Sequence, residues 1–339
     1  AETGHSRIDV RRVNMIKPSQ IPYEMVCGGT IDSGEMTELF DMALATADVA
    51  GFAKRKAESA ENGKLRGIGF GMYLEQCGNG ADDGVDIEFQ DDGRVILHGS
   101  QQCNGQGHQT TVTQILSDRL GYDADLITVK QGDSSRSPRG TTGGARMTAV
   151  LGSATALAAA KIIDLAKPFA ARALECGEGD LNFTDGLFLR QETNRSIAIE
   201  GLVRQLAISG KKHRLDWSQP YETDGATYPY GCHIIELEID RQTCAVDIAS
   251  YHVVDDFGFV INPLTLEGQI HGGIAQGVGQ ALLEHVVYDD SGQLLAGSLM
   301  DYALPRADHF PGFQISTRNT ACANNALGIK GSGEAGAIG

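Results

Sequence analysis

Two stretches of alternating apolar and polar side chains, one in each half of the chain, constrain the fold more than any other feature. Residues 85–97 alternate on both sides of the turn Asp91-Asp92-Gly93, and residues 235–248 alternate on both sides of residues 240–243. Such alternation is typical of strands with one buried face, and a polar turn between two of them indicates an antiparallel hairpin. The sequence therefore predicts a hairpin in each half.

Each predicted hairpin is followed by a helical pattern. Apolar residues recur at helical spacing over residues 112–120 and again from Leu266 to Leu282. The repeated order of hairpin and helix predicts an α+β fold of two similar units, rather than a doubly wound parallel sheet. We expect an N-terminal arm and helix over residues 1–62, a first unit over 63–209 and a second unit over 210–339.

Three further elements are expected. Residues 36–60 have helical apolar spacing, and residues 65–74 form a glycine-rich, apolar run typical of a buried strand. An alanine-rich helix is predicted over residues 148–174, where Pro168 is expected to kink or break it.

The net charge and the cysteines limit the classes of partner. The 28 Lys and Arg against 44 Asp and Glu give a net charge of −16, which disfavours nucleic acid and anionic membranes as partners. No run reaches the roughly 18 apolar residues of a membrane helix. No signal peptide is recognisable, although the start at Ala1 leaves open a preceding segment. The 7 cysteines include no C-x-x-C pair, so we expect a cytoplasmic protein without disulfides or an iron–sulfur or zinc box of its own.

Four glycine-rich segments are candidates for ligand binding. The first, residues 105–110, leads into a predicted helix whose free N–H groups suit an anion, and the amide of Gln106 suits the edge of a heterocycle. The second, residues 140–148, also leads into a helix and carries Arg146, whose guanidinium suits a phosphate. Taken alone, the first segment is better explained as a tight turn before a capped helix, and the second equally well as a solvated loop.

The third segment is a helix with five glycines among residues 268–279. Each glycine costs a helix about 1 kcal/mol against alanine, so another backbone or a cofactor is expected to pack very close to it. The fourth segment, residues 330–336, matches G-x-G-x-x-G but lacks the strand and helix of a dinucleotide-binding unit. It leaves Glu334 as a carboxylate on a loop, suited to a general base or to an ordinary surface position.

In this order the four segments resemble the molybdenum hydroxylases, the family of xanthine dehydrogenase, aldehyde oxidase and the carbon monoxide dehydrogenase large subunit. The likeness runs from Arg11-Arg12-Val13-Asn14-Met15-Ile16 through residues 63–69 and Ile261-Asn262-Pro263 to residues 330–336. It covers nearly the whole chain. The resemblance implies a molybdopterin-binding domain of the aldehyde oxidase/xanthine dehydrogenase type, in which residues 63–209 and 210–339 are the first and second molybdopterin-binding units.

The resemblance also implies the roles of individual residues. Glu334 is expected to be the catalytic base in the hydroxylation of a carbon of an N-heterocycle or aldehyde with water-derived oxygen. No residue is expected to ligate the metal. The expected cofactor is molybdenum–molybdopterin in its cytosine dinucleotide form, with [2Fe–2S] and FAD on partner chains. The residues expected to bind it are Gln106, Gly107, His108, Thr110, Gly143, Gly144, Ala145, Arg146, Met147, Thr148, Gln269, Lys330, Gly331, Ser332 and Gly333.

The sequence departs from the family in two ways, because the large upstream half is missing and the chain stops just past Glu334. The resemblance therefore implies an upstream half on a separate chain or a missing segment, as in nicotinate-dehydrogenase-like enzymes. Further expected partners are an iron–sulfur subunit, an FAD subunit and a small-molecule substrate. Two alternatives stay open: a non-catalytic subunit that holds the cofactor or assists assembly, and a carbon monoxide dehydrogenase-type large chain. An NAD-dependent dehydrogenase would need a βαβ unit that the sequence does not indicate.

Overall fold

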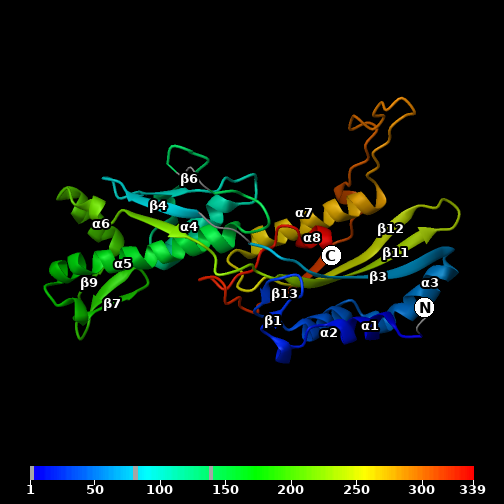
Figure 1. The fold of residues 1–339 in the computed structure, drawn as a ribbon, viewed down its shortest axis with the longest axis horizontal. Helices are drawn as coiled ribbons and strands as arrows, with labels where there is room; N and C mark the ends of the chain where they lie inside the picture. The colour runs from blue at the N-terminus through cyan, green and yellow to red at the C-terminus, as the bar shows by residue number, and fades with distance from the viewer. Residues whose placement is uncertain (1–3, 79–82, 137–139) are drawn as a thin grey trace. The chain divides into compact units, whose positions relative to one another are not determined.

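The computed structural model describes residues 4–78, 83–136 and 140–339, which form two compact units (Figure 1). Unit 1 contains Ala1–Cys77, Tyr228–Cys322 and Ser332–Gly339, and unit 2 contains Gly78–Thr227 and Ala323–Gly331. Each unit is thus assembled from separate stretches of chain, whereas the sequence predicts consecutive segments. Residues 137–139, directly before the predicted segment 140–148, lie outside the described residues.

Unit 1 is built on a four-stranded sheet. Its order is β13 (Phe313–Arg318), β12 (Val246–Asp256), β11 (Tyr230–Asp240) and β3 (Lys64–Leu74). The strands β11 and β12 pair antiparallel, which confirms the second predicted hairpin, and β3 pairs antiparallel with β11 along its whole length. The strand over residues 65–74 is confirmed, but the expectation that it is buried is wrong: within β3 only Tyr73 is buried, and the other residues are half-buried or exposed.

Helices cover both faces of this sheet (Figure 1). One face carries α2 (Met36–Thr46) and α3 (Phe52–Glu61), and the other carries α7 (Pro263–Leu282), whose apolar side chains form a core with β3 and β12. The helix predicted over residues 36–60 is therefore two helices. Asp48 separates them, because its backbone is left-handed (φ 44°) and its side chain accepts from the Gly51 N–H at 3.2 Å.

Unit 2 contains a second four-stranded sheet, in the order β10 (Trp217–Tyr221), β4 (Asp83–Phe89), β5 (Val95–Gly99) and β6 (Ile127–Gln131). The antiparallel pair β4 and β5 confirms the first predicted hairpin. The strand β6 pairs parallel with β5 after the helix α4 (His108–Leu120). The sheets are thus mainly antiparallel with helices packed on them, which confirms the α+β prediction.

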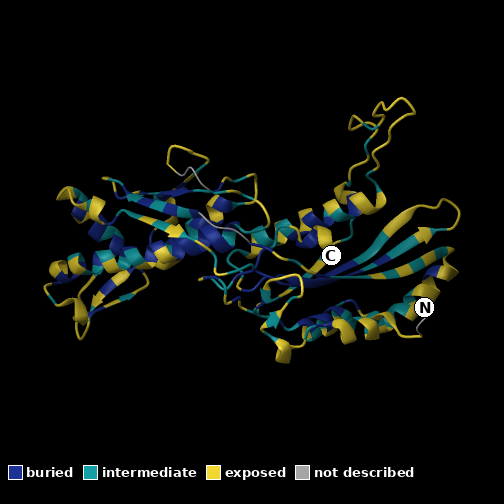
Figure 2. Ribbon diagram, viewed as in Figure 1, coloured by how far each residue is buried: buried dark blue, intermediate teal, exposed yellow. Residues whose placement is uncertain are grey.

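The core helix of unit 2 is α5 (Ser153–Leu174), preceded by a π-helical turn (Thr148–Gly152). It is buried over much of its length (Figure 2). Pro168 lies inside α5 and does not break it, because the buried Ala166 and Ala170 pack the helix against the core on both sides of the proline. By length and composition, Thr148–Leu174 is the one described helix that could cross a membrane. In this fold 67% of its most apolar stretch is buried.

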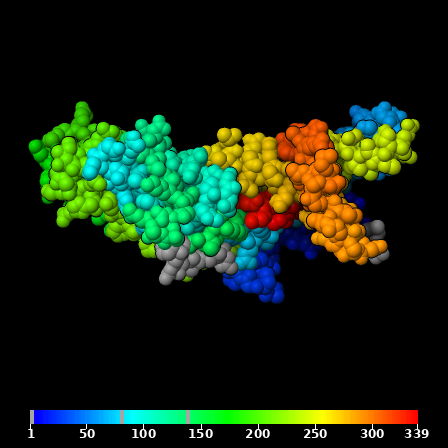
Figure 3. Space-filling model, turned by 90° about the horizontal axis from the view of Figure 1, so that it is seen from above, coloured from blue at the N-terminus to red at the C-terminus, as the bar shows by residue number. Residues whose placement is uncertain are grey.

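The remaining elements are short. Residues 283–304 of unit 1 extend from the C-terminal end of α7 as an arm with one isolated bridge, Tyr288 to Leu294 (Figures 1 and 3). The other helices and strands are α1 (Arg7–Asn14), η1 (Pro18–Gln20), β1 (Tyr23–Glu24), β2 (Thr30–Ile31), η2 (Val49–Gly51), η3 (Ala124–Leu126), η5 (Glu178–Asp180), β7 (Leu181–Thr184), β8 (Leu187–Arg190), β9 (Ser196–Ala198), α6 (Ile199–Ile208), η6 (Lys212–Arg214), η7 (Ala307–His309) and α8 (Ala335–Ile338).

Candidate active site

Glu334 stands at the start of α8 in unit 1. Its backbone carbonyl oxygen accepts hydrogen bonds from the N–H groups of Ala337 and Ile338, each at 3.0 Å, which close the single turn of α8. Its side chain is exposed. The position of this carboxylate therefore depends on how firmly α8 is held.

Glycines hold α8 against α7, and the two segments lie side by side on the surface (Figure 3). A Cβ atom on Gly336 would lie 2.5 Å from the Ile270 carbonyl oxygen, and one on Gly273 would lie 2.8 Å from the Cα of Gly336. Another backbone thus explains Gly273, and also Gly277, where a Cβ would lie 3.0 Å from the Ala337 oxygen. Added Cβ atoms on Gly268 and Gly272 would meet no atom of the described residues within 4 Å.

Gln269 fixes the loop in front of Glu334. Its Nε2 donates a hydrogen bond to the carbonyl oxygen of Gly333 at 2.9 Å. This bond ties α7 to the residue directly before the catalytic candidate. The structure therefore gives Gln269 a local role in placing Glu334, while its expected contact with the pterin stays a prediction.

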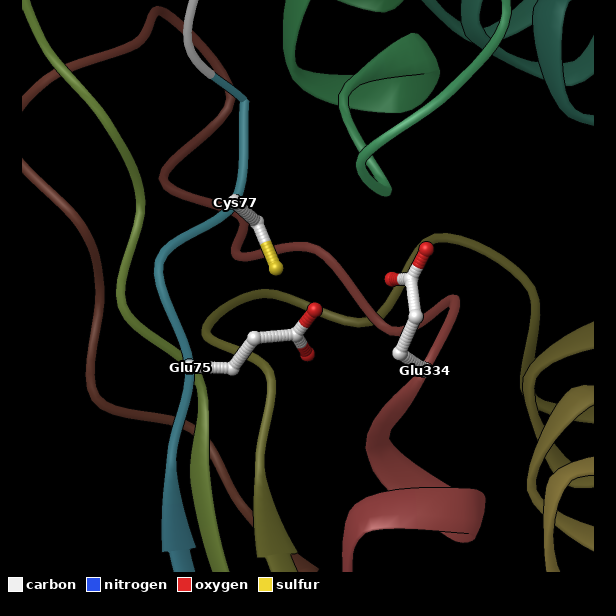
Figure 4. Close-up of side chains that lie close together, drawn as sticks. All are labelled: Glu75, Cys77 and Glu334. Carbon is white, nitrogen blue, oxygen red and sulfur yellow. The ribbon is translucent and has the colours of Figure 1, made fainter.

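A second carboxyl group faces Glu334. Glu75 follows directly after β3, where its backbone N–H donates to the Pro229 carbonyl oxygen at 3.0 Å. Glu75, Cys77 and Glu334 each offer an atom that lies within 4.8 Å of the other two (Figure 4). Strand β3 and the α7–α8 packing thus bring together groups that are far apart in the sequence.

The environment of Glu75 changes its acidity. Burial, followed by the interaction with the nearby Glu334 carboxyl group, raises the pKa of Glu75 from 4.5 to about 7. Burial also raises the pKa of the Cys77 thiol, with a smaller contribution from Glu75, so Cys77 stays neutral at physiological pH. The Oε2 atom of Glu75 is buried and has no hydrogen-bond partner among the described residues.

Beneath this pair, the sheet contains a buried polar network. The Tyr73 hydroxyl donates to Asp255 Oδ1 at 3.0 Å, and His233 Nδ1 lies 3.0 Å from the Tyr251 hydroxyl. All four side chains are buried, and burial raises the pKa of both tyrosines. The network joins β3, β11 and β12 and keeps the end of β3 in a fixed place below Glu75.

The segment 105–110 lies in unit 2, where it leads into α4 as predicted. Gly107 has a positive φ of 77°, and a Cβ on Gly105 would meet nothing described within 4 Å. Gln106 is exposed and its Oε1 accepts from the Asn104 N–H at 2.5 Å, while Thr110 is exposed on the first turn. His108 is buried, which lowers its pKa, and its Nδ1 has no partner in the described part of the chain.

The segment 140–148 also lies in unit 2. Cβ atoms on Gly143 and Gly144 would meet nothing described within 4 Å, and Ala145 has a positive φ of 50°. The Arg146 guanidinium donates to Asp83 Oδ2 at 2.5 Å and to the Thr141 carbonyl oxygen at 3.1 Å. Arg146 thus holds its own loop to β4. Two further predicted contact residues, Met147 in the core and Thr148 on the π-helical turn, begin the following helix.

The predicted site residues belong to both units. Lys330 is buried and Gly331 donates to the Thr227 hydroxyl at 3.1 Å in unit 2, whereas Ser332, Gly333 and Glu334 belong to unit 1. The predicted contact of Gln106, Ala145, Arg146, Gln269 and Glu334 with one cofactor site involves residues of both units and stays a prediction. Glu75 and Cys77 were not among the residues predicted from the sequence. Their position directly after a glycine-rich strand was the only available signal.

The fold and these segments define a class of protein. It is an α+β domain in which glycine-rich loops lead into helices and a carboxylate is held where two helices pack together. A known protein family has these features. The model of the molybdopterin cofactor-binding domain matches residues 42–311, so the chain belongs to this family.

Known proteins with similar sequences and structures agree with this family. The chain is 32% identical to the carbon monoxide dehydrogenase large chain of Hydrogenophaga pseudoflava, over 98% of this chain and 44% of the relative. It is 30% identical to the nicotine 6-hydroxylase large subunit of Paenarthrobacter nicotinovorans, over 98% of this chain and 43% of the relative. The fold matches quinoline 2-oxidoreductase from Pseudomonas putida 86 with a TM-score of 0.90 and 29% identity, over 99% of this chain and 45% of that one. The chain thus spans less than half the length of these proteins.

Proposed function

We propose that this chain forms the molybdopterin-binding, catalytic part of a molybdenum hydroxylase that hydroxylates a carbon of an N-heterocycle or aldehyde with oxygen from water. The observation that carries the proposal is the placement of Glu334. Its loop is tied to α7 through Gln269, and α8 is locked to α7 by backbone contact. A non-catalytic cofactor-holding subunit would have no need of a carboxylate placed in this way.

The segments expected to bind the cofactor suit molybdopterin chemically. Glycines 105, 143 and 144 leave open space where a side chain would stand, so a ligand can approach their backbone N–H groups. Gln106 and Thr110 expose an amide and a hydroxyl, and His108 keeps a buried nitrogen without a described partner. Such groups fit a pterin heterocycle and its phosphates.

Glu334 is the proposed base, and the rest of the site serves to hold it. When bound, the molybdenum cofactor supplies the oxygen atom and takes up the electrons of the oxidation. The carboxylate of Glu334 accepts the proton that is released as the oxygen becomes nucleophilic. Gln269 and the glycine contacts of α8 keep that carboxylate in one place, which lowers the entropic cost of the proton transfer.

The assembly around this chain is part of the proposal. We expect the cytosine dinucleotide form of the cofactor, and [2Fe–2S] and FAD on separate subunits. The polypeptide that corresponds to the remaining length of the relatives would supply the rest of the molybdenum site. We expect this complex to work in the cytoplasm without nucleic acid or membrane as partner, since the chain carries a net charge of −16.

The test is Glu334→Gln in the assembled enzyme. The amide keeps the size of the side chain but accepts no proton, so we expect normal molybdenum content and a rate lowered by about 10²–10⁴-fold. Glu267→Gln is the matched control, because Glu267 is exposed on α7 and bonds only weakly, to His271 at 3.7 Å. Near-normal turnover in Glu334→Gln would show that the base has been misassigned, and wild-type enzyme without molybdenum would refute the function.

The same preparation distinguishes the substrate classes. The chain is about equally similar to a carbon monoxide dehydrogenase and to a nicotine hydroxylase. Reduction of an artificial electron acceptor by carbon monoxide, by N-heterocycles and by aldehydes would be compared. Activity with carbon monoxide alone would favour the carbon monoxide dehydrogenase-type alternative.

A further inference from the structure

Glu75 is a titratable group beside the proposed base that the proposed mechanism leaves unused. It sits on a fixed backbone, at the end of β3 and bonded to Pro229, whereas Glu334 projects from a single helical turn. Figure 4 shows the two carboxyl groups turned towards one another, with the Cys77 sulfur beside them. Their closest groups lie within 4.8 Å, so a small side-chain rotation brings two oxygens into hydrogen-bond contact.

Two carboxyl groups this close, without a cation between them, disfavour ionisation of both, so one of them keeps its proton more readily. The groups that shift the pKa of Glu75 are Glu334 and Cys77, with no Lys or Arg among them in the described chain. Glu75 is half-buried and Glu334 is exposed, so the remaining proton is held more strongly by Glu75. Its Oε2 has no described partner and is free to carry that proton.

We propose that Glu75 is a positioning residue for Glu334: its protonated carboxyl donates a hydrogen bond to the Glu334 carboxylate and holds the base in place. This inference rests on the proposed function. During turnover Glu334 accepts the proton that is released as the oxygen becomes nucleophilic and passes it to solvent, while Glu75 keeps its own proton. No electron or further reactant is involved.

The arrangement makes the hydrogen bond from Glu75 depend on pH. Below about pH 7 Glu75 keeps its proton and donates to Glu334. Above about pH 7 Glu75 ionises, and it then repels the Glu334 carboxylate instead of holding it. The titratable groups that face Glu75 are Glu334 from α8, Cys77 from the following loop and Tyr73 from β3; the thiol and the phenol stay neutral in this range.

The first test needs no activity. Carbon-13 NMR titration of the full chain, labelled at the glutamate side-chain carboxyl carbon, would follow each Glu. We expect one carboxyl to titrate near pH 7, to vanish in Glu75→Gln, and to titrate at lower pH in Glu334→Gln. If every glutamate titrates in the ordinary acidic range, Glu75 holds no proton for Glu334 near neutral pH. The inference then fails, independently of the activity of the assembled enzyme.

The second test is the pH profile of kcat in the assembled enzyme. Wild type should lose activity as Glu75 ionises, which gives an alkaline limb near pH 7. Below about pH 7, Glu75→Ala should lower kcat by roughly 10- to 100-fold, since the base is no longer oriented, and the difference from wild type should shrink above that pH. Glu75→Gln should recover most of that loss and abolish the limb, because its amide donates at all pH values.

The two tests separate this inference from the proposed function. A purely structural Glu75 would leave the alkaline limb unchanged in Glu75→Gln, and that result would overturn the inference. Glu267→Gln, outside the pair, should retain the wild-type profile. If NMR detects the elevated Glu75 titration but the assembled enzyme catalyses no hydroxylation, the inference about the pair stands and the proposed function is wrong.

Discussion

Burial of Glu75 makes the stability of unit 1 depend on pH. The pKa of Glu75 rises from 4.5 to about 7 on folding, so between these values the folded chain holds a proton that the unfolded chain has released. Its contribution to the free energy of unfolding is therefore largest at acidic pH. The contribution falls as pH rises from the unfolded pKa to the folded pKa.

Glu75→Gln should therefore be more stable than wild type in alkali. We expect a gain of roughly 1–2 kcal/mol at about pH 8, a figure reduced because the half-exposed carboxyl is partly screened by water. At about pH 5 the difference should nearly vanish, because the wild-type carboxyl is then protonated in the folded chain. Urea unfolding of the full chain at both pH values measures this. An equal difference at both would contradict the elevated pKa.

For individual residues, the sequence predicts a functional role for Glu334 but not for Glu75. Glu334 can be recognised because glycines surround it in an ordered set of motifs. Glu75 has no such motif, and its chemistry depends on a long-range contact between β3 and α8. Arg146 is a similar case, since its side chain suits a phosphate by type but its bonds to Asp83 appear only in the fold.

Among the elements, the contact between α7 and α8 determines the position of Glu334. The two backbones approach so closely that a methyl group on Gly273 would displace α8. The neighbouring Gly272 is exposed, and a methyl group there would meet no described atom within 4 Å. The same helix thus contains a sensitive site and a matched control one residue apart.

We expect Gly273→Ala to keep unit 1 folded but to loosen α8 and lower kcat by about 10²-fold, because a small displacement of the base is costly. Gly272→Ala should instead stabilise the chain by about 1 kcal/mol, as alanine favours the helix. Amide hydrogen exchange of Ala337 and Ile338 would report the loosening directly. Unchanged exchange and turnover in Gly273→Ala would show that the backbone contact does not hold Glu334.

Local patterns predict elements better than they predict their ends or partners. The alternation around residues 85–97 identified the first hairpin because one face of β4 is buried. In the second hairpin the alternating residues Ile235 and Ile239 are half-buried or exposed, while Glu236 between them is buried. The break at Asp48 was missed, since a single left-handed residue hardly changes apolar spacing. Pro168 was expected to kink or break the helix, but α5 continues through it, because the packing of α5 against the core outweighs one missing hydrogen bond. The pairing of β3 with β11 could not be predicted, because no local sequence pattern indicates a partner that is distant in the chain.

Considered as a whole molecule, this chain should bind molybdopterin weakly on its own. The predicted contact residues are divided between the two units, and a net charge of −16 opposes an anionic ligand. The relatives contain more than twice the length of polypeptide. We expect metal analysis and pterin fluorescence to find far less than one cofactor per isolated chain, and near full occupancy in the complete complex. Stoichiometric cofactor on the isolated chain would contradict this expectation.

The interleaved composition of the units has a consequence for synthesis on the ribosome. Unit 2 is completed by Ala323–Gly331 and unit 1 by Ser332–Gly339, so each waits for residues that are translated after all strands of both sheets. The nascent chain must therefore keep two partly built cores in solution, a state in which exposed apolar surface attracts chaperones and other nascent chains. Glu334 enters its place only when α8 closes on α7. Translation that stops before residue 332 would leave a chain with every described strand and without the proposed base.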